Sequence, residues 1–130
     1  MNKYLNYNFL IRAGLGLIFI ANALTAFFAP ADFIEIIKSS FVANILPFNP
    51  AIFAHIIIGL NDSIVGLLLI VGIATRRVAV WATIWLIGVM IVIGNPLEIM
   101  EHSGLLLLSA TLVLGDQYLN KNDGSESTKS

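Results

Sequence analysis

The sequence predicts an all-α integral membrane protein, a four-helix bundle with a short amphipathic surface helix between spans one and two. Of its 130 residues, 58% are hydrophobic and only 12% are charged, and the mean hydropathy is +0.88. A soluble domain usually carries about 25% charged residues, and one this small has too much surface to hide so much apolar material. Since every backbone group must be paired inside a bilayer, the spanning segments are expected to be helices.

Four segments are candidates for spans, because a helix needs about 20 mainly apolar residues to cross a bilayer. The first three are long apolar runs, whereas the clean apolar part of the fourth covers only residues 104–115. This fourth helix reaches full length only if "LEIMEHS" joins it, which brings Glu98, Glu101 and His102 into its first turns. The expected spans are 8–28, 50–73, 77–95 and 97–117.

The segment "APADFIEIIKSSFVANILPFNP" joins the first two spans. Pro30 stands where a helix can begin, and Pro47 and Pro50 stand where one must stop. Apolar and polar residues recur with a helical period between them, which predicts an amphipathic helix at the membrane surface over 31–44. This helix could be a lid over the bundle or a linker resting among head groups, and we favour the linker.

Positive charge indicates the orientation, because cytoplasmic loops are rich in lysine and arginine. These residues cluster at the start of the chain, between spans two and three, and after span four, whereas the other two loops are mainly acidic. The pattern predicts an inner-membrane protein with both termini cytoplasmic. We expect one membrane domain over 1–119 and a disordered tail over 120–130, which is polar and rich in Gly and Ser.

Composition also excludes several classes of function. The net charge is −1, so no basic field invites nucleic acid. The chain has no cysteine, which rules out disulfide exchange, thiolate metal sites and Fe–S ligation by its own residues. Two histidines without a recognised spacing are a weak metal signal, so no metal site is predicted. Glycines in the first three spans are expected to permit close helix contact, namely Gly14, Gly16, Gly59, Gly66, Gly72, Gly88 and Gly94.

Asp62 lies near the middle of span two, where an ionisable group costs about 2.5–3.5 kcal/mol or more. Such groups usually face the bundle and find partners there. Arg12 on span one is the candidate partner, at a depth that differs from that of Asp62 by roughly 9 Å at 1.5 Å rise per residue. A pair with Asp62 and a side chain that snorkels to the head groups are equally open for Arg12.

Further polar residues predict a column through the bundle. His55 lies two helical turns from Asp62 on one face, and Glu98 and His102 lie four residues apart on another helix. The column could hold the head group of an amphipathic ligand such as a quinone. It could also relay protons or a small solute, or be a structural network that locks the helices together. Its members would be Arg12, Asn22, His55, Asn61, Asp62, Glu98 and His102.

Several motifs resemble the DoxX family of small four-span membrane proteins. "LIRAGLGLIFI" is similar to the family's first span, and Asp62, Gly66, Gly72 and "ATRRVAVWA" follow the pattern of its second. "LVLGDQYL" is similar to the end of its fourth span, so the resemblance covers residues 9–119. The chain departs from the family in having Asp62 where glutamate is more common, and in a longer connection between spans one and two.

The resemblance implies a four-helix bundle associated with redox systems. Some members of the family are membrane subunits of a thiosulfate:quinone oxidoreductase, and others assist thiol or oxidative-stress systems through partner proteins. The matched polar positions are Arg12 and Asp62. The resemblance does not decide whether the chain is itself an enzyme, and it leaves an oligomer open.

The leading hypothesis is a redox-associated membrane subunit that binds a quinone-like ligand or docks a redox partner. Arg12 and Asp62 would form its buried polar centre, and His102 or Asp62 could act as acid or base. The first alternative is transport of protons or a small solute through the bundle. The second is a structural subunit of a larger membrane complex.

Overall fold

The computed structural model describes residues 3–126, and the side chains of residues 7–115. Helices α1 and α4–α6 form the body of the bundle, and no strand occurs in the part of the chain that is described. The elements are α1 (Lys3–Phe28), α2 (Ala31–Ser39), the 3₁₀ turn η1 (Phe41–Asn44), α3 (Pro50–Ile52), the π-helix η2 (Phe53–Ile58), α4 (Gly59–Val71), α5 (Thr75–Ile93) and α6 (Pro96–Glu126).

Four stretches are long and apolar enough to cross a membrane: Tyr7–Phe28, Pro50–Val71, Thr75–Ile93 and Pro96–Gly115. The predicted fold class is therefore confirmed, and the chain is a multi-pass membrane protein. Helix α6 begins at Pro96, so "LEIMEHS" does join the fourth span. The same helix continues to Glu126, into the segment expected to be a disordered tail, and residues 127–130 lie outside the described part of the chain.

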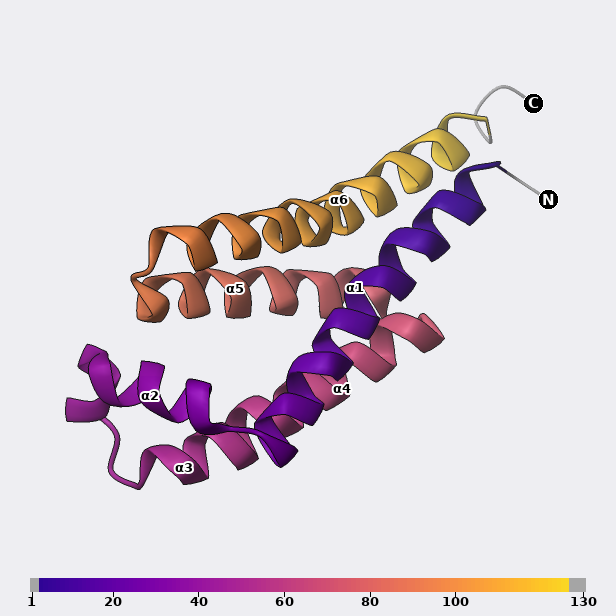
Figure 1. Cartoon of the computed structure of the whole chain (residues 1–130). Coiled ribbons are helices and arrows are strands. Elements are labelled where there is room, and N and C mark those ends of the chain that lie inside the picture. Colours follow the sequence, from indigo (N-terminus) through magenta and orange to yellow (C-terminus); the bar gives the residue numbers. More distant parts are fainter. Residues whose placement is uncertain (1–2, 127–130) are drawn as a thin grey trace.

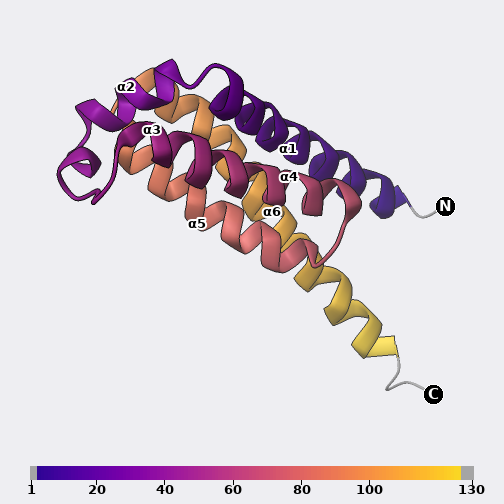
Figure 2. The same cartoon turned by 90° about the horizontal axis from the view of Figure 1, so that it is seen from below.

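The bundle consists of two helix pairs. Helix α1 packs along α4, and α5 packs along α6, whereas α4 and α5 touch each other much less. The start of α1 and the end of α6 lie at one end of the bundle, and α2 and α3 lie at the other (Figure 1). The same arrangement is seen from below in Figure 2. We call the end with the α4–α5 turn the turn end, and the opposite end the α2 end.

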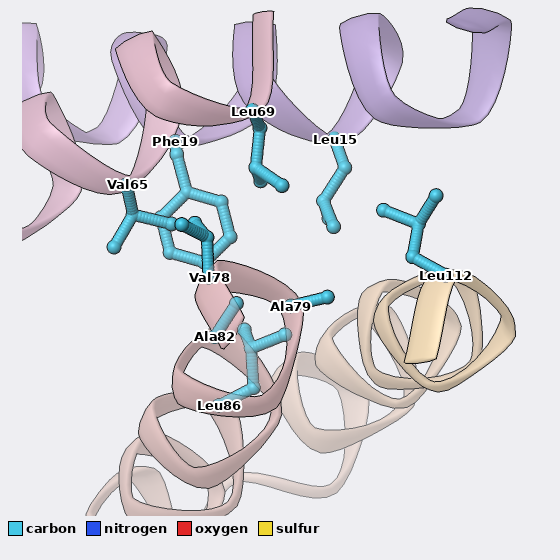
Figure 3. Packing of buried hydrophobic residues seen from close by; sticks show 9 residues of the cluster. All are labelled: Leu15, Phe19, Val65, Leu69, Val78, Ala79, Ala82, Leu86 and Leu112. Atoms are coloured by element: carbon cyan, nitrogen blue, oxygen red, sulfur yellow. The ribbon is translucent and has the colours of Figure 1, made fainter. Parts of the chain in front are cut away.

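The buried core joins the two pairs toward the turn end. Leu15 and Leu69 are fully buried and face small residues of α5, with Leu112 of α6 closing one side (Figure 3). Lipid tails are as apolar as leucine, so van der Waals packing rather than the hydrophobic effect stabilises such a core. The cluster comprises Leu15, Phe19, Val65, Leu69, Val78, Ala79, Ala82, Leu86 and Leu112.

Glycines set the closeness of α1 and α4. A Cβ atom on Gly16 would lie 2.8 Å from the carbonyl oxygen of Gly66, and a Cβ on Gly66 would lie 2.8 Å from that of Gly16. A Cβ on Gly59 would lie 2.7 Å from the ring of Phe27. The expectation of close contact was wrong for Gly14, Gly88 and Gly94, whose added Cβ atoms would meet nothing within 4 Å.

Candidate functional site

A cavity of about 330 Å³ lies between the two helix pairs, on the α2 side of the buried core. Its walls are almost entirely apolar, and they come from all four spans and from α2. The polar residues among them are few. The lining residues are Phe19, Asn22, Phe33, Ile36, Ile37, Phe53, Ile58, Asp62, Trp81, Ile84, Trp85, Leu86, Gly88, Val89, Val92, Ile93, Glu98 and His102.

Helix α2 forms a wall of this cavity. Phe33, Ile36 and Ile37 line it, and Ile37 is only 3% exposed. Asp32 and Glu35 on the same helix are exposed, so the amphipathic pattern was interpreted correctly as a surface helix. The preference for a bare linker was wrong, because the apolar face of α2 packs onto the bundle and contacts α3 and α5.

Asp62 projects from the first turn of α4 and is only 2% exposed. Its Oδ1 accepts a hydrogen bond from Nδ2 of Asn61 at 2.9 Å, and Trp85 lines the same cavity. Nε1 of Trp81 donates to Oδ1 of Asn61 at 2.8 Å, which fixes the orientation of that amide. The Asn61 amide, itself held by the Trp81 indole, therefore holds the carboxyl group at the cavity wall.

Arg12 does not pair with Asp62. Its guanidinium lies against Gly72, ten residues beyond Asp62, or about 15 Å along the helix at 1.5 Å rise per residue. The reason is the register of α1 on α4, which places Gly16 against Gly66 and Ile70 and so brings Arg12 to the last turn of α4. The sequence estimate of depth treated each span alone and could not include this register.

Glu98 and His102 lie at the α2 end of the cavity, in the first turns of α6. Nδ1 of His102 is 2.7 Å from the carbonyl oxygen of Glu98. A carbonyl oxygen can only accept, so Nδ1 must carry the proton, and in the neutral ring Nε2 is left as an acceptor. Asn95 caps the helix through the backbone N–H of Leu97 and contacts the Glu98 carboxyl group at 3.4 Å.

The remaining candidates divide between the cavity and other places. Asn22 lines the cavity from α1, whereas His55 is not among its walls. His55 lies in the π-helix η2, whose i→i+5 hydrogen bonds widen the turn and change the angular step per residue. The two-turn spacing to Asp62 that an α-helix would give therefore does not hold.

A model of the DoxX family matches residues 8–95, which is more than half of the chain. The chain belongs to the DoxX family. No curated protein and no solved structure shows a significant match to it. The matched region ends before α6, so Glu98 and His102 lie outside the part of this DoxX protein that the family model covers, whereas Asn22, Asn61 and Asp62 lie inside it.

Two residues of the site in this DoxX protein were not among the candidates named from the sequence. Trp81 and Trp85 both line the cavity beside the Asn61–Asp62 pair, and Trp81 bonds Asn61. The signal was available in their spacing, because residues four apart share a helix face. An indole N–H inside a membrane also needs an acceptor, and Oδ1 of Asn61 is the acceptor for that of Trp81.

Proposed function

We propose that this DoxX protein binds a quinone-like amphipathic ligand inside the bilayer and acts as a redox-associated membrane subunit. The observation that carries the proposal is the apolar cavity with a buried carboxyl group in its wall. Ligand pockets are typically about 300–1,000 Å³ and apolar, with a few convergent polar groups that fix orientation. The cavity has that character, at the small end of the range.

The polar groups suit a ring that carries carbonyl or hydroxyl oxygens. The Asn22 amide can donate, Nε2 of neutral His102 can accept, and Asp62 can accept or, when protonated, donate. The Trp85 ring supplies an aromatic wall beside the carboxyl group. When a partner protein takes two electrons from the reduced ring, the two hydroxyl protons leave to acceptors such as these, which is why we propose Asp62 and His102 as the proton partners.

The tail of such a ligand needs a way into the lipid, and the gap between α4 and α5 supports one. Trp81 and Ile84 line the cavity, yet they are 50% and 57% exposed. Gly88 also lines it and is exposed, with nothing within 4 Å of an added Cβ. Since α5 packs chiefly on α6, its opposite face leaves a lateral opening toward α4, through which a long chain would leave.

The chain has no cysteine and no recognised cofactor motif, so we propose that a partner protein exchanges electrons with the bound ligand. The clustering of positive charge at the turn end supports an orientation with both termini cytoplasmic in the inner membrane. Transport is a weaker proposal, because the buried core stands between Asp62 and the turn end. Protons or a solute would have to pass Leu69 and Leu15, which are fully buried.

The test is native mass spectrometry of the protein in gentle detergent, followed by lipid extraction. The wild type should carry, or take up, an isoprenoid quinone, and Asp62→Asn should lose at least about 90% of it, because 1.4 kcal/mol of lost interaction is already tenfold. Asp32→Asn is the matched control, since it removes an exposed carboxyl group on α2. An unoccupied wild type that takes up no added quinone would contradict the proposal, as would equal losses in both variants.

A further inference from the structure

Charge is segregated between the two ends of the bundle. Within residues 7–115, the charged side chains at the turn end are Arg12, Arg76 and Arg77. No ion pair to these arginines forms among those described side chains. The acidic side chains of α2 and of the first turns of α6 lie at the opposite end, and they are Asp32, Glu35, Glu98 and Glu101.

The backbone of the α4–α5 turn opens a groove at this end. Gly72 ends α4 in the left-handed conformation, with φ of 86°, and the N–H groups of Gly72 and Ile73 both bond the carbonyl oxygen of Leu68. Ala74 is also left-handed, with φ of 48°, and gives α5 no side-chain cap. The groove is lined by Gly72, Ala74, Thr75, Arg76, Arg77 and Val80.

Arg12 reaches the same turn from α1. Its Cζ lies where it would be 2.6 Å from a Cβ on Gly72, so the guanidinium packs directly on the glycine backbone. Its Nε is buried without a hydrogen-bond partner, and so is Oδ1 of Asn8 one turn earlier. The centroid of the Phe9 ring lies 5.6 Å from Cζ of Arg12, and this cation–π contact compensates only part of the guanidinium charge. This corner of the bundle therefore has hydrogen-bonding capacity that the described residues do not use.

We propose that the turn end binds the phosphate of an anionic phospholipid, with Arg76 and Arg77 as its main ligands and Arg12 behind them. Guanidinium groups bond phosphate oxygens bidentately, and basic pockets at the ends of membrane helices hold anionic head groups. A lipid is the source that fits, because exposed apolar side chains flank the groove where acyl chains would run. These are Val71, Ile73 and Val80, which are 65%, 56% and 40% exposed.

The experiment measures lipid retention by native mass spectrometry with added phosphatidylglycerol or phosphatidylcholine. The wild type should prefer phosphatidylglycerol by about tenfold or more, since each basic residue near a membrane surface contributes roughly fivefold. Arg76→Gln with Arg77→Gln should abolish that preference. Both side chains are exposed, so this variant should fold even if Arg12→Gln does not. Lys38→Gln, an exposed lysine on α2 at the other end, is the control.

Three results would overturn the proposal: equal retention of the two lipids, an equal loss of preference in Lys38→Gln, or displacement of the lipid by millimolar inorganic phosphate. The last would point to a free phosphate as the ligand. The proposal does not depend on the cavity, since quinone binding should be unchanged in Arg76→Gln with Arg77→Gln.

Discussion

The α1–α4 contact and the α4–α5 contact of the bundle are built in opposite ways. Between α1 and α4, Gly16 and Gly66 let two backbones approach so closely that no side chain fits between them. Between α4 and α5, the large side chains of Trp81 and Trp85 stand beside the Asn61–Asp62 pair, and a cavity remains. In lipid, close helix packing needs small residues at the contact. The comparison teaches that the stability of this bundle and its candidate site rest on different residues.

The largest expected effect is on the glycine contact. Gly66→Leu would force a side chain against the carbonyl oxygen of Gly16 and the side chain of Ile20, with no space at the Cβ position. Overpacking typically costs about 1–3 kcal/mol, and here the α1–α4 pair must separate as well. We expect the midpoint of thermal unfolding in detergent to fall by several degrees or the protein to aggregate on extraction.

Gly14→Leu is the matched control for that variant. Gly14 lies on α1 two residues before Gly16. It is exposed, and a Cβ added there would meet nothing within 4 Å. Its unfolding midpoint should match that of the wild type. A Gly66→Leu protein as stable as Gly14→Leu would show that the close α1–α4 contact does not hold the bundle together.

The next prediction concerns a variant that should change the candidate site and leave the fold intact. Gly88→Leu adds a side chain to the cavity wall at a position with open space. It should lower the affinity for a quinone about tenfold or more, because the side chain takes volume from a cavity of only about 330 Å³. The measurement is titration of Trp fluorescence with a short-chain quinone, alongside the unfolding midpoint, which should not change.

Gly104→Leu serves as the control here, since it also has nothing within 4 Å of its added Cβ but does not line the cavity. A wild-type affinity in both variants would place the binding site somewhere else. An affinity below that of the wild type in both would indicate a general effect of added bulk on the lipid-facing surface.

The sequence predicted the fold well because it reports length and hydrophobicity directly. "LEIMEHS" was interpreted correctly as the start of the fourth span, since only that choice makes the apolar segment long enough to cross. Asp62 was likewise correctly expected to face the bundle, because a lipid-facing carboxyl group is too costly at that depth.

The site was harder to predict because it depends on how the helices are aligned. The predicted Arg12–Asp62 pair does not form, because the contact of Gly16 with Gly66 aligns Arg12 with Gly72 instead. This alignment depends on two helices together and cannot be seen in either one alone. His55 was expected on the same helix face as Asp62, because nothing in "FAHIII" indicates a π-helix. The cavity itself arises from the separation of two helix pairs, which no single segment encodes.

The smallest expected effect lies at a polar contact within the other helix pair, between α5 and α6. Ser109 is fully buried, and its hydroxyl donates to the carbonyl oxygen of Ala79 at 2.9 Å and lies 2.8 Å from Oγ1 of Thr83. Interhelical hydrogen bonds in membrane proteins contribute about 0.6 kcal/mol on average. Ser109→Ala should therefore reduce the free energy of unfolding only slightly, because Oγ1 of Thr83 still bonds the Ala79 oxygen.

The contrast with a second hydroxyl makes this small effect measurable. Thr111 is exposed on the same helix and bonds only the Leu107 carbonyl oxygen of its own helix, so Thr111→Ala should leave the unfolding free energy unchanged. Unfolding of both variants in SDS would resolve a difference of this size. A quinone affinity that falls in Ser109→Ala would contradict the division between residues that hold helices together and residues that form the site, because Ser109 belongs to the α5–α6 contact and does not line the cavity. A cost well above about 1.7 kcal/mol, the upper end for such bonds, would mean that the Ser109–Thr83 pair organises α5 and α6 rather than merely joining them.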